Sequence, residues 1–330
     1  MNRLIYYGSV EAIPFYNCSW KPLVEWEATG VQHPWLGFPI IFLGVFFELL
    51  YIPIINIIFN TGLIKYTCYK IIIMLAIFDM TAITCSCFVT GFLLVQGGVF
   101  CTYPSLIYFD GGFGLGNWCT TCAITVSLFL NRTVSIAFKE YADVIEKRLA
   151  VVSMFLCFCY FLYIFLLTPP PIYNSYIMAW IPDPLSEEVP SAEAAAWYKN
   201  SSQAFNNWTF SVTMVVLFTI YCILVKKLAR GQKSKTSRAI FIQCCLICSF
   251  NAFTAVFFNT LPFFNPAPWI AIVGQVVWSI NHGVPGIIYI TMNDTIRREF
   301  KKLFCSKLKH RVNEKRSSLA NTNSITVTNN

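Results

Sequence analysis

Seven long apolar stretches dominate this 330-residue sequence and decide what kind of fold it can adopt. An α-helix needs about 20 mainly apolar residues to cross the hydrocarbon core of a bilayer. The stretches that reach this length cover residues 36–60, 69–95, 107–138, 149–167, 208–228, 239–261 and 269–292. The sequence therefore predicts an all-α membrane protein whose seven transmembrane helices pack as a bundle.

The composition agrees with a membrane environment. Charged residues make up 12% of the chain and hydrophobic residues 56%, and the mean hydropathy is +0.58. A soluble domain carries about 25% charged residues. The net charge of +8 does not indicate nucleic-acid binding, because the basic residues lie in short segments between the apolar stretches.

The distribution of Lys and Arg predicts the orientation of the bundle. If the N-terminus is outside the cell, the outer segments hold three of the 24 basic residues and the inner segments hold 21. Basic residues are concentrated on the cytoplasmic side of membrane proteins. We therefore expect an extracellular segment over residues 1–35, the bundle over residues 36–292, and a cytoplasmic C-terminus.

Two kinds of covalent modification are predicted on the outer side. Asn17, Asn200 and Asn207 each begin an Asn-X-Ser/Thr motif there, which is the acceptor sequence for N-linked glycans. Cys18 and Cys101 lie in outer segments, where oxidising conditions permit a disulfide between them. The alternative is two unpaired thiols.

A basic amphipathic segment follows the seventh stretch. Its apolar residues recur at helical spacing between Arg and Lys side chains, at Ile296, Phe300, Leu303 and Phe304. Such a helix, over residues 293–305, lies in the membrane interface with its cations toward anionic lipid. Cys305 is a candidate for palmitoylation because it is next to the membrane. We expect the polar tail over residues 306–330 to be disordered.

Acidic residues inside membrane spans are candidate functional residues, because burying them in a bilayer is costly. Glu48 and Asp79 lie within the first and second stretches, and Asp110 lies near the outer end of the third. A hydrogen bond to another helix explains Glu48 better than ligand contact. Asp110 either binds a ligand or is solvated at the surface. Trp118 and Thr121, in the outer half of the third stretch, are further candidates for a ligand cavity.

Several short motifs occur in a characteristic order along the chain. The general ones are Leu75–Asp79 in the second stretch, the pair Asn131–Arg132 ending the third, and Pro285 with Tyr289 before the basic helix. With seven spans and an outer N-terminus, the sequence resembles a G-protein-coupled receptor. It more narrowly resembles the nematode serpentine chemoreceptors of class T. The strings that carry this resemblance are Tyr16-Asn17-Cys18-Ser19, Cys68-Tyr69-Lys70-Ile71, Cys101-Thr102-Tyr103-Pro104, Gly116-Asn117-Trp118-Cys119 and Leu130-Asn131-Arg132.

The resemblance implies a receptor that binds a small-molecule cue outside the cell and activates a heterotrimeric G protein inside. Its expected location is the plasma membrane, specifically the ciliary membrane of sensory neurons. It implies no cofactor. By resemblance, the residues that switch the bundle or face the G protein are Asp79, Arg132, Lys226, Lys227, Pro285 and Tyr289.

Three positions depart from the wider receptor pattern. Asn131 stands where an acid usually precedes Arg132, so the usual ion pair within the helix is missing. Tyr289 follows Pro285 by four residues where the pattern has three. The second outer loop also lacks its usual cysteine.

The main alternative is a seven-span transporter or ligand-gated channel, because acids within helices also line ion pathways. The sequence contains no internal repeat, which argues against a transporter. An enzyme is not expected. His33, His282 and His310 are too far apart to suggest a histidine-bound metal, and no nucleotide-binding or nucleophile motif occurs.

Overall fold

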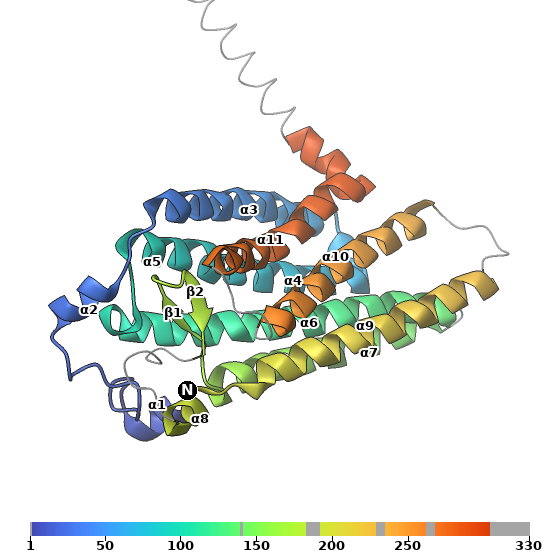
Figure 1. Cartoon of the computed structure of the whole chain (residues 1–330). Coiled ribbons are helices and arrows are strands. Elements are labelled where there is room, and N and C mark those ends of the chain that lie inside the picture. The colour runs from blue at the N-terminus through green and yellow to red at the C-terminus, as the bar shows by residue number, and fades with distance from the viewer. Residues whose placement is uncertain (1, 139–140, 183–191, 229–234, 262–267, 304–330) are drawn as a thin grey trace, which may run out of the picture.

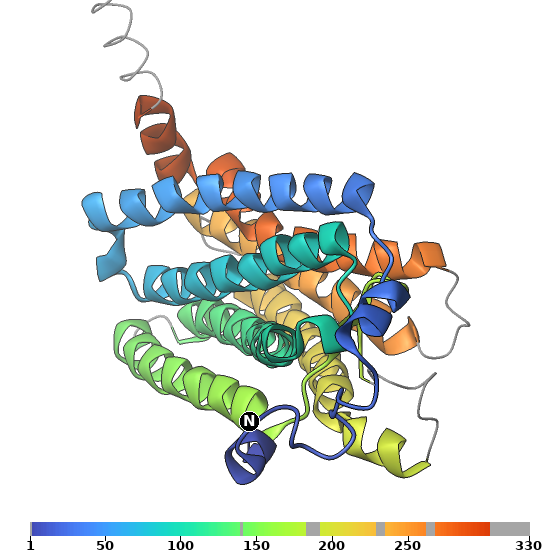
Figure 2. The same ribbon diagram turned by 90° about the vertical axis from the view of Figure 1, so that its left-hand side faces the viewer.

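The computed structural model describes residues 2–138, 141–182, 192–228, 235–261 and 268–303. Among these residues, seven helices are long and apolar enough to cross a membrane. They pack side by side as an elongated bundle (Figures 1 and 2). The prediction of an all-α membrane protein with seven spans is confirmed.

The spans follow the predicted stretches closely. They are α3 (Pro34–Asn60), α4 (Thr67–Ile83) continued by η2 (Thr84–Val89) and α5 (Thr90–Gln96), α6 (Pro104–Ala137), α7 (Ala142–Leu167), α9 (Ser201–Leu228), α10 (Lys235–Thr260) and α11 (Pro268–Met292). α7 and α9 begin well before the predicted positions 149 and 208. Their first turns are polar and therefore lie upstream of the apolar stretch that marked each span.

The second span is irregular near its middle. Six residues, Thr84–Val89, form a π-helical segment between two α-helical ones. A π turn contains one extra residue, and such turns occur frequently at functional sites. The hydroxyl of Thr90 donates to the carbonyl of Cys85 at 2.8 Å. No sequence pattern predicted this segment.

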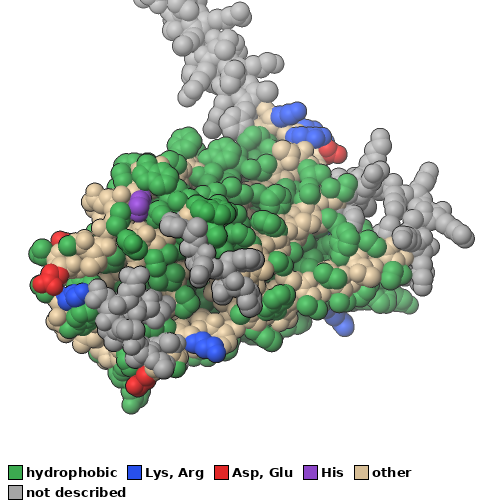
Figure 3. Space-filling view, viewed as in Figure 1, with side chains coloured by type: hydrophobic (Ala, Val, Ile, Leu, Met, Phe, Trp, Pro, Cys, Tyr) green, Lys and Arg blue, Asp and Glu red, His purple; other side chains and the backbone are tan. Residues whose placement is uncertain are grey.

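The third span, α6, lies at the centre of the bundle and packs against α4, α7, α9 and α10. In its most apolar window 72% of the residues are buried within the protein, against 17% in α7. This position explains why the third span, with a mean hydropathy of 1.4, is less apolar than five of the other six: its polar side chains face other helices and not lipid. On the face drawn in Figure 3, apolar side chains cover the middle of the bundle, and charged side chains lie toward its two ends.

Several short elements cover the end of the bundle that carries the N-terminus. They are α1 (Asn2–Tyr7), α2 (Leu23–Thr29), η3 (Phe100–Thr102), α8 (Ala192–Tyr198) and an antiparallel hairpin of β1 (Ile172–Asn174) and β2 (Ala179–Ile181). The backbone of the hairpin turn is tied down, because Ser175 donates to the carbonyl of Gly98 at 3.1 Å. The sequence analysis did not anticipate this hairpin.

The opposite end of the bundle carries η1 (Leu63–Lys65) and a short helix over residues 294–303 (Figure 1). Asn293 caps this helix, since its Oδ1 accepts from the backbone nitrogen of Ile296 at 3.1 Å. Ile296 is fully buried against the bundle. On the exposed side, hydrogen bonds from Lys302 and Arg298 lower the pKa of Glu299. Phe304, Cys305 and the tail lie outside the described residues.

Candidate functional site

A buried acid–histidine–tyrosine cluster joins three helices in the middle of the bundle. Asp79 on α4 lies 2.8 Å from Nδ1 of His282 on α11. The hydroxyl oxygen of Tyr51 on α3 lies 3.0 Å from the Asp79 carboxylate and 2.7 Å from the His282 carbonyl oxygen. All three side chains are almost completely buried. Buried polar groups are normally hydrogen-bonded, and this cluster meets that requirement for Asp79 by joining α4 to two neighbours.

The cluster lies next to the proline of the seventh span. α11 continues as one helix through Pro285, three positions after His282. Tyr51 therefore reaches the α11 backbone in the turn that contains this proline. The sequence analysis identified Asp79 and Pro285 but missed His282 and Tyr51. A histidine within an apolar span was the available signal for His282; nothing local distinguished Tyr51 from other tyrosines.

A second polar network joins α6 to α9 and α10. The indole nitrogen of Trp118 donates to Oδ1 of Asn207 at 2.8 Å, and Nδ2 of Asn207 donates to Oδ1 of Asn259 at 3.2 Å. The ring of Trp118 also lies 6.2 Å from that of His282, edge to face. The hydroxyl of Thr121 donates to the Trp118 carbonyl at 2.9 Å, within its own helix. The two networks are therefore in contact through Trp118.

This network corrects one predicted glycosylation site. Asn207 is fully buried and holds α6 and α10 together, so a glycan cannot be attached to it in this fold. Nδ2 of Asn200, the atom that a glycan would join, donates to the carbonyl oxygen of Pro169 at 2.6 Å. Asn17 is exposed, and its Oδ1 accepts from the backbone of Ser19 at 2.7 Å. Of the three predicted acceptors, Asn17 is the most exposed.

Cys18 and Cys101 lie together at the N-terminal end of the bundle. Sγ of Cys18 is bonded to Sγ of Cys101, which connects the segment before α2 to η3. The indole of Trp26 donates to the Cys18 carbonyl at 3.0 Å and packs the same segment against the bundle. The disulfide thus lies where the N-terminal segment meets the start of α6.

Arg132 lies at the opposite end of α6 with a partner from another helix. Its Nη2 is 2.8 Å from Oδ1 of Asn131 and 4.0 Å from a carboxylate oxygen of Glu146 on α7. The side chains of Arg132 and Glu146 are 17% and 15% exposed, so solvent screens this pair less than a surface pair. Asn131 is fully buried. The acid that the sequence lacks before Arg132 is thus supplied by α7, which sequence reasoning missed.

The described part of the chain shows few contacts for the remaining predicted switch residues. Tyr289 is buried near Tyr51 and Asp79, and its hydroxyl has no hydrogen-bond partner within the described part of the chain. Lys226 and Lys227 end α9, but their side chains lie outside the described part. Glu48 is half-buried, and its Oε1 likewise has no partner among the described residues.

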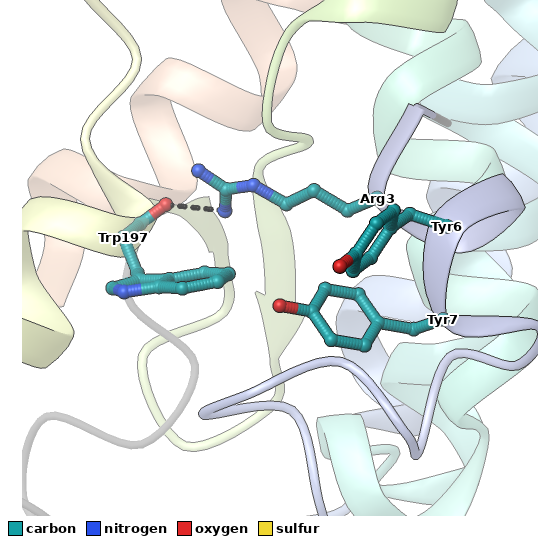
Figure 4. Close-up of a pocket in the computed structure, with 4 residues that line it drawn as sticks. All are labelled: Arg3, Tyr6, Tyr7 and Trp197. Atoms are coloured by element: carbon teal, nitrogen blue, oxygen red, sulfur yellow. Dashed lines mark hydrogen bonds between the residues drawn. The ribbon is translucent and has the colours of Figure 1, made fainter.

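A separate hollow of about 390 Å³ lies at the surface of the N-terminal end (Figure 4). It is lined by Arg3, Tyr6 and Tyr7 of α1 and by Trp197 of α8. The Arg3 guanidinium lies 4.6 Å from the Trp197 ring centroid, and its Nη1 donates to the Trp197 carbonyl at 2.7 Å. These contacts hold α1 against α8. None of the four was predicted from the sequence to be a site residue.

Nearly the whole chain is similar to known proteins. Residues 3–313 match the model of the family described as serpentine type 7TM GPCR chemoreceptor Srt. The chain belongs to this family. Serpentine receptor class T-55 of Caenorhabditis elegans is 26% identical over 305 residues, which cover 87% of this chain and 80% of the relative. The resemblance to the class T serpentine receptors is confirmed, and the chain is a multi-pass membrane protein of a chemoreceptor family.

In this serpentine receptor the predicted residues fall into separate places along one bundle. Asp79 meets His282 in the middle, three positions before Pro285 and near Trp118, while Arg132 lies at the end opposite the N-terminus. Asp110 lies on α6 toward the N-terminal end. Among the described residues no three His, Cys, Asp or Glu side chains are grouped so that they can hold a metal ion.

Proposed function

We propose that this receptor binds a small-molecule cue between its helices and activates a heterotrimeric G protein at the opposite end of the bundle. Membership of the Srt family supports the receptor class. The observation that carries the proposal further is the Asp79–His282 contact, because it joins the second and seventh spans midway between Asp110 and Arg132. A change of helix packing at one end can therefore reach the other end only if it moves or breaks the Asp79–His282 contact.

The proposed orientation places the N-terminus and the β hairpin outside the cell. Its support is the distribution of basic residues, of which 21 of 24 fall on the other side. The disulfide between Cys18 and Cys101 also favours this orientation, since disulfides persist in oxidising compartments. The proposed location is the plasma membrane, in particular the ciliary membrane of sensory neurons.

The proposed G-protein surface is the end that carries Arg132, together with the segment that begins at Lys226 and Lys227. In the arrangement described here, Glu146 engages Arg132 and holds α6 against α7. Release of this ion pair would free the arginine for a partner. A cue that binds the active arrangement more tightly by a few kcal/mol is sufficient to shift such a two-state equilibrium substantially.

The test is ligand-dependent nucleotide exchange in membranes that contain the receptor and an added heterotrimeric G protein. A panel of small volatile and soluble compounds is screened, and ion current and substrate flux are recorded in the same membranes. We expect at least one compound to accelerate exchange without current or flux. Current or flux without exchange would instead establish a channel or transporter.

A further inference from the structure

The π-helical segment η2 and the facing side of α6 enclose a group of polar side chains that neither polar network uses. Cys85 in η2 is buried, and its side chain lies near Asp110 and Asn117 of α6. These two residues are seven positions apart, so they share one face of the helix. The cluster lies between the Asp79–His282 pair and the N-terminal end of the bundle.

Two atoms of this cluster are buried without a hydrogen-bond partner in the described part of the chain: Oδ2 of Asp110 and Nδ2 of Asn117. Asn117 is completely buried, and its Oδ1 accepts from the hydroxyl of Thr81 at 3.1 Å, so the unpaired nitrogen is held in place. Within the described part of the chain, Asp110 forms no ion pair with a Lys or Arg side chain. An unpaired buried polar atom is costly and is rarely kept without a partner.

An aromatic surface lies beside the unpaired atoms. Gly114, one turn after Asp110, leaves room for the ring of Trp278, because a Cβ at this position would lie 3.3 Å from that ring and 3.6 Å from Cβ of Cys85. The ring of Trp278 also packs against that of His282 at 6.5 Å. Nε2 of His282, which belongs to the neighbouring Asp79 cluster, is also buried without a partner among the described residues. The site therefore combines an acid, hydrogen-bonding groups and an indole ring.

The β hairpin covers this cluster on the side of the N-terminus. A Cβ on Gly111, next to Asp110, would collide with the carbonyl oxygen of Pro171, just before β1. The indole of Trp180 in β2 donates to the hydroxyl of Thr90 at 3.0 Å, immediately after the π-helical segment. A molecule bound at Asp110 would thus touch the hairpin and η2 together.

We propose that this cluster is the cue-binding site and that its ligand is a small aromatic amine, with the ammonium group on Asp110, a hydrogen-bond acceptor on Asn117 and the ring beside Trp278. The ammonium supplies the counter-charge that Asp110 lacks in the bundle, and charge-assisted hydrogen bonds are the stronger kind. An indole is also the best aromatic neighbour for a cation. This proposal rests on the proposed receptor function, because the bound amine is a cue only if the protein is a receptor.

The test measures binding directly and needs no G protein. Purified receptor in lipid nanodiscs is heated with each of three compounds of the same skeleton: 2-amino-1-phenylethanol, 1-phenyl-1,2-ethanediol and mandelate. We expect the amine to raise the unfolding temperature at millimolar concentration, and the diol and the acid to have no effect. A rise of equal size with the diol or mandelate, or no rise with the amine, would overturn the proposed ligand class.

Two variants locate the effect. Asp110→Asn should need at least a tenfold higher amine concentration for the same rise in unfolding temperature. Glu48→Gln, which alters another acid of the bundle, should respond at the original concentration. Both variants are compared for unfolding temperature without ligand, so that loss of folding is recognised. A full response of folded Asp110→Asn would place the amine elsewhere. Failure of G-protein activation with intact amine binding would contradict only the proposed function.

Discussion

Asn293 connects the end of the seventh span to the start of the second. Its Nδ2 donates to the hydroxyl oxygen of Tyr69 at 2.8 Å, while its Oδ1 caps the helix over residues 294–303. One side chain therefore fixes both the position of this helix and its first turn. The two spans that meet at Asp79 and His282 in the middle of the bundle are joined again here, at the end proposed to face the G protein.

Tyr69→Phe should destabilise the receptor measurably. It leaves Nδ2 of Asn293 buried without a partner, which costs about 1–3 kcal/mol. The unfolding temperature in nanodiscs reports the loss. Tyr66→Phe is the matched control, because Tyr66 is 64% exposed and a surface change of this kind alters stability by about 0.5 kcal/mol at most. Equal unfolding temperatures for the two variants would contradict a structural role for the Asn293–Tyr69 bond.

Asp79→Ala and His282→Ala should each lower the unfolding temperature strongly. Removing one member of a buried pair costs roughly 3–5 kcal/mol, because the other is left unpaired. The double variant should lose less than the sum of the two, since both single changes break the same contact. Strictly additive losses would show that the two side chains do not interact in the membrane.

The seven spans could be predicted from apolar length alone, because lipid requires a long uninterrupted apolar helix wherever the chain crosses. The same requirement says little about which side chains meet inside the bundle. Asp79 was conspicuous as an acid in a span. Its partners lie on other helices, Tyr51 at a distance of 28 residues along the chain and His282 at a distance of 203. Only the packing of the helices brings them together.

Other features escaped the sequence analysis for similar reasons. The π-helical segment Thr84–Val89 contains no proline or glycine to mark it. The hairpin of β1 and β2 is short and irregular in its polarity, and it is fixed by contacts with Gly98 and Thr90 far away in sequence. Asn207 matched a glycosylation motif, but the face of α9 on which it lies decides its role, and that face points inward.

Arg132→Ala should abolish G-protein activation while delivery to the cell surface remains normal. The side chain of Arg132 is 17% exposed, and its 4.0 Å ion pair with Glu146 is the one contact that it makes with another helix, among those found in the described residues, so the fold should survive its loss. Nucleotide exchange and surface labelling of the same cells measure the two effects. Exchange at normal strength would show that Arg132 has no part in activation.

Glu146→Gln should raise nucleotide exchange in the absence of any cue. The substitution removes the charge that holds Arg132 to α7, which favours release of the arginine. Asp143→Asn is the control on the same helix, because the ion pair of Asp143 with Lys147 is exposed and contributes little. Basal exchange that is unchanged in Glu146→Gln, or raised equally in both variants, would contradict a restraining role for Glu146.

Asn17→Gln should remove a glycan and increase electrophoretic mobility, whereas Asn207→Gln should leave mobility unchanged. Asn207 is buried between Trp118 and Asn259, so its substitution should instead lower the unfolding temperature. Treatment with a glycosidase that removes N-linked glycans provides the reference for full deglycosylation. A glycan on Asn207 would contradict the inward orientation of this side chain.

An epitope tag fused to Met1 tests the proposed orientation, on which both the cue site and the G-protein surface depend. Antibody binding is measured on living cells before and after the plasma membrane is permeabilised. We expect the tag to be labelled fully on intact cells, with no further gain after permeabilisation. Labelling that appears only after permeabilisation would place the N-terminus inside the cell and contradict the proposed direction of signalling.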